Sequence, residues 1–324
     1  MRTPVLTPSS PRVLPVPVDG GPFKLSMGLR SLKLQDWLEI DEDFSAYLTE
    51  KRRLLDVRHS DVFAALPSTG EDGLQVLQHV AAHVVQRYPD IYEETSAGIR
   101  IRPLDEIIPW RDDALHPLDW AGRLTMEDWC LMAPPGWPDP TCSEDNPNQG
   151  YSLIAASLCF PTRWRLSDKI GKPMGAIHEP VAGYAERLEN PVDKFFSMLA
   201  EDRPVWRLNW GLLDDSALFQ PSGHERTEVN RAITDDNAGD EIWLRIERQT
   251  LRRMPPLREG LPGNILFGIR IHQAPLGTLV NQPALRSGLL TELQTMDEAT
   301  WRYKSMSAVG QAAIAWLELQ NPGV

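Results

Sequence analysis

Residues 241–272 read EIWLRIERQTLRRMPPLREGLPGNILFGIRIH, and this stretch decides the fold. Apolar residues recur at every second position in both halves, as in strands whose two faces differ. The alternating apolar residues are Ile242, Leu244 and Ile246 in the first half, and Ile265, Phe267, Ile269 and Ile271 in the second. The proline- and glycine-rich segment MPPLREGLPG predicts the connection between them. We therefore expect a long hairpin with strands over 241–250 and 264–272.

Four more segments predict strands, because they are apolar or alternating runs bounded by turn residues. They are residues 98–102, 126–132, 152–160 and 206–213. The predicted fold class is therefore α+β, an antiparallel sheet with inserted and flanking helices.

Helical periodicity is clearest over 73–88, where apolar residues recur three and four apart. Residues 32–55 predict one or two further helices, and residues 165–201 predict a mostly helical segment inserted between strands. Within that insert, Asn190 followed by Pro191 is typical of a helix start.

Composition limits the possible partners. The net charge of −12 argues against a nucleic-acid surface, which needs clustered Lys and Arg, and it suits a cationic substrate or a basic redox partner. No apolar run approaches the ~20 residues that cross a bilayer, so we expect no membrane span.

The three cysteines, Cys130, Cys142 and Cys159, are too widely spaced for a disulfide framework, a zinc site or an iron–sulfur site, which favours a reducing compartment. Residues 1–21 carry five prolines and no apolar core of a secretory signal, so we expect a disordered tail before a single domain over 22–324. We expect a cytoplasmic protein. The scarcity of acids in the tail leaves an organelle matrix as the alternative.

Residues 163–184, RWRLSDKIGKPMGAIHEPVAGY, place one histidine between Pro173 and Pro180, and arginine-bearing strands follow at WRLNW (206–210) and LRIERQTLRR (244–253). Buried guanidinium groups persist only where an anion or carboxylate offsets their desolvation. This combination predicts a site that needs an anionic partner.

The chain resembles the α subunits of haem-dependent oxidative N-demethylases. The resemblance rests on EDWCLM (127–132), the run WRLSDKIGKPMGAIHEPV (164–181), RLNW (207–210), ERQTLRR (247–253) and YK (303–304). These blocks recur in order across nearly the whole chain. One departure is Ala182, where the family tends to have proline, which could loosen the turn before the next helix.

The resemblance implies a PAS-like haem domain that oxidises a small secondary amine such as dimethylamine with dioxygen. His178 becomes the candidate proximal ligand and metal ligand of haem b. The residues alone favour the alternative, a core histidine bonded to a backbone carbonyl. A ligating imidazole is neutral, with its second nitrogen fixed by a hydrogen bond.

Four residues are candidates for the reacting side of the pocket. Arg207 and Asn209 lie two apart and therefore share a strand face, where Arg207 could donate to dioxygen or a propionate; otherwise it pairs with an acid at the surface. Glu127, or its neighbour Asp128, could hold the ammonium group of the amine, the alternative being a solvated strand end. Tyr184 could donate a hydrogen bond at the pocket edge or simply pack.

Three cations are candidates for binding the haem propionates. Arg248 is the strongest, because its strand face is apolar and a guanidinium binds a carboxylate through two hydrogen bonds. Arg163 and Lys169 are weaker candidates. Arg245 and Glu247 share the other face, where an ion pair or a cross-strand network is the simplest interpretation.

An oxygenase that uses haem needs electrons from a donor. The chain has neither a G-x-G-x-x-G dinucleotide fingerprint nor cysteines spaced for an iron–sulfur cluster. Electrons would therefore come from a reductase, which the resemblance implies to be NADPH-dependent, with flavin and an iron–sulfur centre held by partner subunits. The alternatives are a haem-binding sensor and a relative that has lost haem.

One apparent metal motif is rejected. His79 and His83 lie four apart, but no Glu stands between them as in metalloproteases, so we interpret both as helix-surface histidines.

Overall fold

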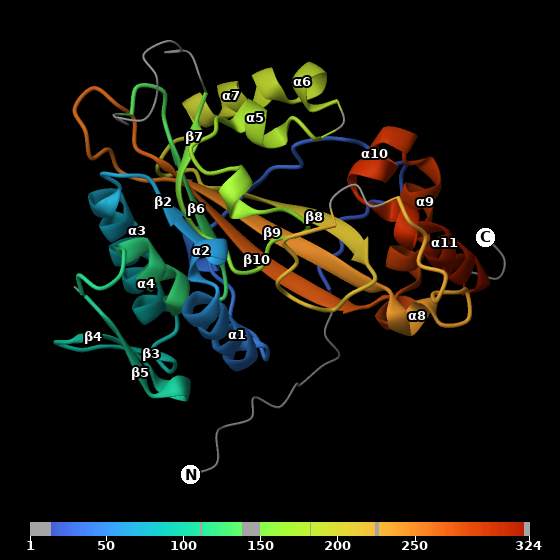
Figure 1. The fold of residues 1–324 in the computed structure, drawn as a ribbon, viewed down its shortest axis with the longest axis horizontal. Helices are drawn as coiled ribbons and strands as arrows, with labels where there is room; N and C mark the ends of the chain where they lie inside the picture. The colour runs from blue at the N-terminus through green and yellow to red at the C-terminus, as the bar shows by residue number, and fades with distance from the viewer. Residues whose placement is uncertain (1–13, 111, 138–149, 182, 224–226, 321–324) are drawn as a thin grey trace.

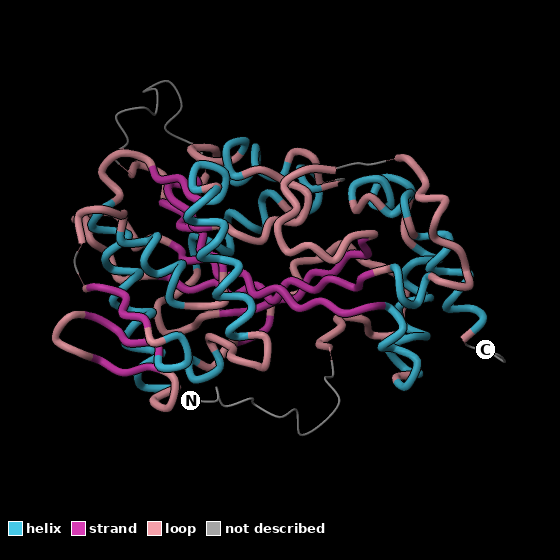
Figure 2. Tube along the Cα trace, turned by 60° about the horizontal axis from the view of Figure 1, so that its bottom comes forward, coloured by secondary structure: helices cyan, strands magenta, loops and turns pink. Residues whose placement is uncertain are grey.

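The computed structural model describes residues 14–110, 112–137, 150–181, 183–223 and 227–320. Its centre is a seven-stranded antiparallel sheet in the order β1-β8-β9-β10-β6-β7-β2 (Figure 1). Helices surround the long strands, which run through the middle of the molecule (Figure 2). The predicted α+β class is confirmed. The narrower PAS-like assignment stays a prediction.

The strands of this sheet differ widely in length. They are β1 (Arg30–Ser31), β2 (Phe63–Ala65), β6 (Asp128–Ala133), β7 (Ser152–Ser157), β8 (Val205–Leu213), β9 (Trp243–Arg253) and β10 (Ile265–Pro275). The predicted hairpin is the β9–β10 pair, in register from Arg253 opposite Ile265 to Trp243 opposite Pro275. The strands predicted over 126–132, 152–160 and 206–213 are confirmed as β6, β7 and β8, with small shifts at their ends.

The predicted strand over 98–102 forms, as β4 (Gly98–Ile101), but in a separate three-stranded sheet. Its partners are β3 (Tyr92–Glu94) and β5 (Glu106–Pro109), its neighbours along the chain. Short connections made this local meander possible, and alternation within one strand cannot reveal which sheet the strand joins.

The helices form three groups, α1 to α4, α5 to α7 and α8 to α11 (Figure 1). The α-helices are α1 (Phe44–Val57), α2 (His59–Val62), α3 (Gly70–Arg87), α4 (Pro117–Leu124), α5 (Met174–His178), α6 (Tyr184–Arg187), α7 (Glu189–Met198), α8 (Ala238–Glu241), α9 (Pro283–Thr295), α10 (Glu298–Tyr303) and α11 (Gly310–Leu319). Short 3-10 turns lie at Leu34–Asp36, Arg102–Leu104, Leu166–Asp168, Leu276–Asn281 and Met306–Ala308. Helices α5 to α7 form the insert between β7 and β8.

The predicted helix over 73–88 is confirmed as α3. The segment 32–55 holds the single α-helix α1, preceded by a 3-10 turn. The predicted start at Asn190 is wrong, because α7 already begins at Glu189 with Leu188 as its N-cap. Pro191 still lies in the first turn, where the missing N–H removes no helical hydrogen bond.

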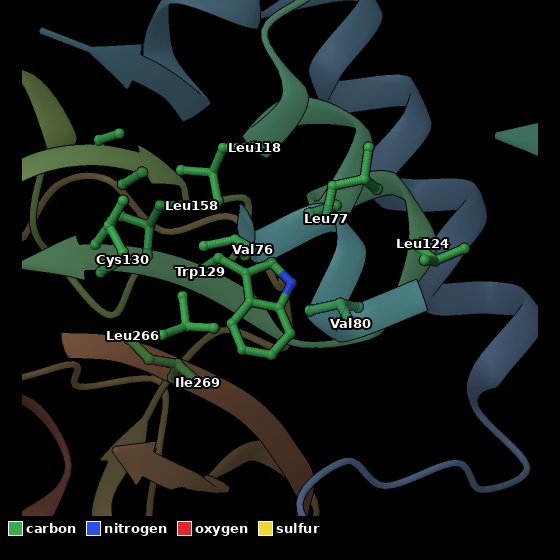
Figure 3. Packing of buried hydrophobic residues seen from close by; sticks show 14 of the residues in the cluster. Val76, Leu77, Val80, Leu118, Leu124, Trp129, Cys130, Leu158, Leu266 and Ile269 are labelled. Carbon is green, nitrogen blue, oxygen red and sulfur yellow. The ribbon is translucent and has the colours of Figure 1, made fainter. Parts of the chain in front are cut away.

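Trp129 on β6 organises the larger of two hydrophobic clusters. Its fully buried indole lies beside Val76 and Val80 of α3 (Figure 3), and its Nε1 donates to Thr125 Oγ1 at 3.1 Å. The adjacent Asp128 is also fully buried. It forms an ion pair with Lys51 of α1 at 3.3 Å and accepts hydrogen bonds from the amides of Cys159 and Phe160. This end of the sheet is therefore closed by both apolar packing and a satisfied charge.

The smaller cluster lies between the sheet and helices α8, α9 and α11. Leu14 and Val16 are buried in it, at 2% and 8% exposure. The described part of the segment expected to be a tail therefore packs on the domain, because its apolar residues reach this cluster. The rest of that segment, residues 1–13, lies outside the described residues. Among the residues that are described, no helix is long and apolar enough to cross a membrane.

Candidate functional site

The pairing of β8 with β9 separates two faces of the sheet. Asn209 lies opposite Glu247 and Arg207 opposite Gln249, so these four side chains share one face, which we call the insert face. Arg248 lies opposite Leu208 and projects from the other side, which we call the far face.

His178 ends the short helix α5, which starts after Pro173. Its Nδ1 lies 3.0 Å from the carbonyl oxygen of Met174, one turn earlier in the same helix. Its ring stacks on Tyr184 with centroids 4.8 Å apart and an angle of 14°. Gly183, with φ of 72°, makes the turn that brings Tyr184 back to the histidine. The preceding Ala182 lies outside the described residues.

The surroundings of His178 keep its imidazole neutral. Burial, together with the positive charges of Lys169 and Arg207, lowers its pKa to about 4. The nearby Met174 carbonyl accepts the Nδ1 proton, so the lone pair is on Nε2. The result is a neutral imidazole whose Nε2 can coordinate a metal or accept a proton.

Arg207 carries a positive charge into the same region. Burial lowers its pKa, although Glu247 and Tyr303 favour the charged form. Within the described residues its Nε is buried without a hydrogen-bond partner, and so is the hydroxyl of Tyr184. Buried polar groups are rarely left unpaired, so the insert face offers two unsatisfied groups close to His178.

Glu247 is the carboxylate of the insert face. One carboxylate oxygen accepts from Thr162 Oγ1 at 2.6 Å, and the other accepts from Gln249 Nε2 at 2.8 Å and Asn209 Nδ2 at 3.4 Å. Arg245 reaches the same network, because its Nε donates to Thr162 Oγ1 at 3.1 Å. Of the two interpretations of Arg245 and Glu247, the cross-strand network is the one observed.

Lys304 reaches the insert face from the end of α10. Its Nζ donates to Asn209 Oδ1 at 3.1 Å and to the carbonyl oxygen of Trp210 at 2.7 Å. Burial lowers the pKa of Lys304 to about 8. Beside it, burial raises the pKa of Tyr303 to about 12. No role was predicted for this YK pair, because only folding brings it to β8, 95 positions earlier in the chain.

Glu127 does not lie with His178. It is 1% exposed, its Oε1 accepts from the amide of Glu39 at 3.1 Å, and its Oε2 is buried without a partner in the described part of the chain. Burial raises the pKa of Glu127. The positive charges of Arg270 and Arg248 on the far face act in the opposite direction and lower it. Asp128, the alternative candidate for holding the ammonium group, forms an ion pair with Lys51.

The three cations predicted to bind the haem propionates do not lie together. Arg248 already binds the Glu39 carboxylate, with Nε 3.0 Å from Oε1, and donates to the carbonyl oxygen of Trp37 at 3.0 Å. Arg163 pairs with Asp214 at 3.0 Å. Only Lys169 lies beside His178, and its Nζ donates to the carbonyl oxygen of Ile177 at 2.8 Å.

The other described histidines and cysteines have structural surroundings. Across the described residues, no group of three or more His, Cys, Asp or Glu side chains is placed to hold a metal ion. The interpretation of His83 as a surface histidine is wrong, since its ring packs edge-on against Trp37 at 5.2 Å and its Nε2 is buried. Cys130 and Cys159 are buried, which raises the pKa of both thiols and leaves them unreactive.

The structure thus brings together His178, Tyr184, Arg207, Asn209 and Lys169, and adds Glu247 and Lys304 to them. Residues 28–314 of the 324 match the model of a family described as haem-dependent oxidative N-demethylase, alpha subunit-like. The match spans every strand of the main sheet, the insert and the first half of α11.

Proposed function

The chain belongs to the haem-dependent oxidative N-demethylase alpha subunit-like family, and from this membership and the insert face we propose that it is the haem-bearing component of an amine N-demethylase. The observation that carries the proposal is His178, a neutral imidazole with Nδ1 anchored and Nε2 available.

The donor set of the insert face fits a haem better than a bare metal ion. A single imidazole cannot hold iron by itself, whereas a porphyrin would supply four nitrogens and need one further ligand from the protein. His178 would be that ligand. Lys169 and Arg207 are cations whose charges act on His178. Of these, Lys169 would offset a propionate. Arg248 and Arg163 are left out of this set, because each already binds a carboxylate of the protein.

Once bound, haem would supply the activation of dioxygen by electrons from a separate reductase. Arg207 would direct its unpaired Nε–H at the developing negative charge near the iron, and the Tyr184 hydroxyl would donate at the edge of the same space. Their burial strengthens such hydrogen bonds, because water competes less.

The substrate would be a small secondary amine such as dimethylamine. A carboxylate on the His178 side of the sheet is needed to hold its ammonium group, and Glu247 meets that condition where Glu127 does not. The balanced reaction joins dimethylamine, dioxygen, two electrons and two protons, and gives methylamine, formaldehyde and water. The electrons would come from an NADPH-dependent reductase with flavin and iron–sulfur partners.

The absorption spectrum of the purified protein tests the haem site. We expect a Soret band in the wild type and its loss in His178→Ala. His79→Ala is the matched control, because its Nδ1 contacts the carbonyl oxygen of Gln75, one turn earlier, at 2.9 Å, the same arrangement as at His178. A His178→Ala protein with an unchanged spectrum would refute the ligand assignment.

Formaldehyde release tests the reaction. The haem-loaded protein is supplied with a competent reductase, NADPH and each of several small secondary amines. We expect formaldehyde in proportion to NADPH consumed, and a large loss in Glu247→Gln with the Soret band retained. Haem binding without formaldehyde from any amine would favour a sensor, and a colourless protein made with ample haem would favour a non-catalytic relative.

A further inference from the structure

Lys304 is a cation of the insert face to which the proposed reaction gives no task. It comes from the C-terminal helices, far along the chain from β8 and β9. Its ammonium group nevertheless donates two hydrogen bonds to β8. Asp297 fixes the start of α10, since its Oδ1 accepts from the amide of Thr300 at 2.7 Å. The side chain is therefore presented by an ordered helix.

The amide of Asn209 stands between Lys304 and Glu247. An ammonium group can only donate, so Lys304 requires the oxygen of the Asn209 amide to face it. The Nδ2 group must then point the other way, towards Glu247 Oε2 at 3.4 Å. Lys304 thus selects one of the two orientations of the amide, and that orientation gives Glu247 a donor.

We propose that Lys304 is a positioning residue that fixes Asn209 and, through it, the Glu247 carboxylate. The inference rests on the proposed function, in which Glu247 holds the ammonium group of the amine. It assigns the C-terminal helices a part in substrate recognition in addition to their packing against the sheet.

A direct electrostatic role predicts the opposite result. Lys304 is positive and shares its environment with Glu247, Arg207, Glu292 and Tyr303. If only its charge mattered, Lys304→Met would remove a repulsion and the cationic amine would bind more tightly. If Lys304 positions Glu247, the same change frees the amide and the amine binds more weakly.

The test measures dimethylamine binding to the haem-loaded protein as a change in its absorption spectrum. We expect Lys304→Met to keep its haem and to raise the Kd about tenfold, as for loss of a hydrogen bond that involves a charged group. Lys304→Arg keeps both charge and donors and should restore most of the affinity. Lys33→Met, at an exposed lysine, is the control and should leave the Kd unchanged.

A double-mutant cycle checks the route through Asn209. In an Asn209→Ala background, Lys304→Met should change the Kd by less than twofold, because the connecting amide is gone. Additive effects would overturn the proposal, as would tighter amine binding by Lys304→Met.

A second measurement needs no amine. The side-chain amide resonance of Asn209, assigned by its loss in Asn209→Ala, should shift strongly in Lys304→Met and little in Lys304→Arg. An unmoved resonance in Lys304→Met would overturn the proposal whatever the amine-binding assay shows. A haem-loaded wild type without any response to amines would instead overturn the substrate assignment and with it the role of Lys304 in recognition.

Discussion

Replacing His178 with glutamine should remove part of the acid sensitivity of the haem-free protein. Burial lowers the pKa of His178 from an ordinary value of 6.5 to about 4. The unfolded chain therefore takes up a proton below about pH 6.5 that the folded chain refuses until about pH 4, and folding is penalised as the pH falls through this window. The penalty is absent at pH 8.

The size of the effect follows from the two pKa values. At pH 5 the unfolded histidine is mostly protonated and the folded one mostly neutral, which costs about 2 kcal/mol, rising to about 3 kcal/mol below pH 4. His178→Gln also loses the hydrogen bond to Met174, but that loss is the same at both pH values. The difference between pH 8 and pH 5 thus isolates the titration.

Urea unfolding of the haem-free protein at pH 8 and pH 5, followed by tryptophan fluorescence, measures this difference. The fall in unfolding free energy between the two pH values should be smaller by about 2 kcal/mol in His178→Gln. His83 offers an independent check, since burial also lowers its pKa to about 4 and it lies by Trp37 on the far face. The two changes should add. Wild-type acid sensitivity in both variants would refute the reasoning.

Three further changes test the sheet and its charges. A Cβ at Gly268 would lie 2.7 Å from the Trp129 ring, so Gly268→Ala should lower the unfolding free energy by about 1–3 kcal/mol in urea, whereas Gly211→Ala, with open space around it, should not. Lys51→Met leaves a buried carboxylate unpaired and should lower the unfolding free energy by about 3–5 kcal/mol, with an unchanged urea midpoint counting against the pair. Burial raises the pKa of Glu127, so wild-type stability should fall as the pH rises past the ordinary glutamate range, and thermal melts of Glu127→Gln should show less of this fall.

The periodicities of the sequence located the long strands of the main sheet and helix α3, but not the short strands β1, β2, β3 and β5. Alternation over 241–272 was sufficient to place β9 and β10 with their connection, because a strand with one buried face must alternate. The three- and four-residue spacing of α3 was equally decisive. The start of α7 was misplaced, since helix ends depend on local capping that several neighbouring residues could supply.

The sequence alone also put Arg207 and Asn209 on one face of their strand, and put Arg248 on the face of the next strand opposite to Arg245 and Glu247. That separation needs only the two-residue period of a strand and is borne out by the β8–β9 register. The resemblance in the blocks from 127 to 304 indicated the family, which the match over 28–314 confirms.

Only the tertiary structure decided which charged groups meet. Glu127 and Arg248 lie with Glu39 on the far face, while Glu247 and Lys304 join His178 on the insert face. Such pairings join residues up to about 200 positions apart, and no local pattern encodes them. The periodicity of a segment fixes the direction of each side chain relative to its own strand or helix, but the partner that it meets depends on how the whole chain packs.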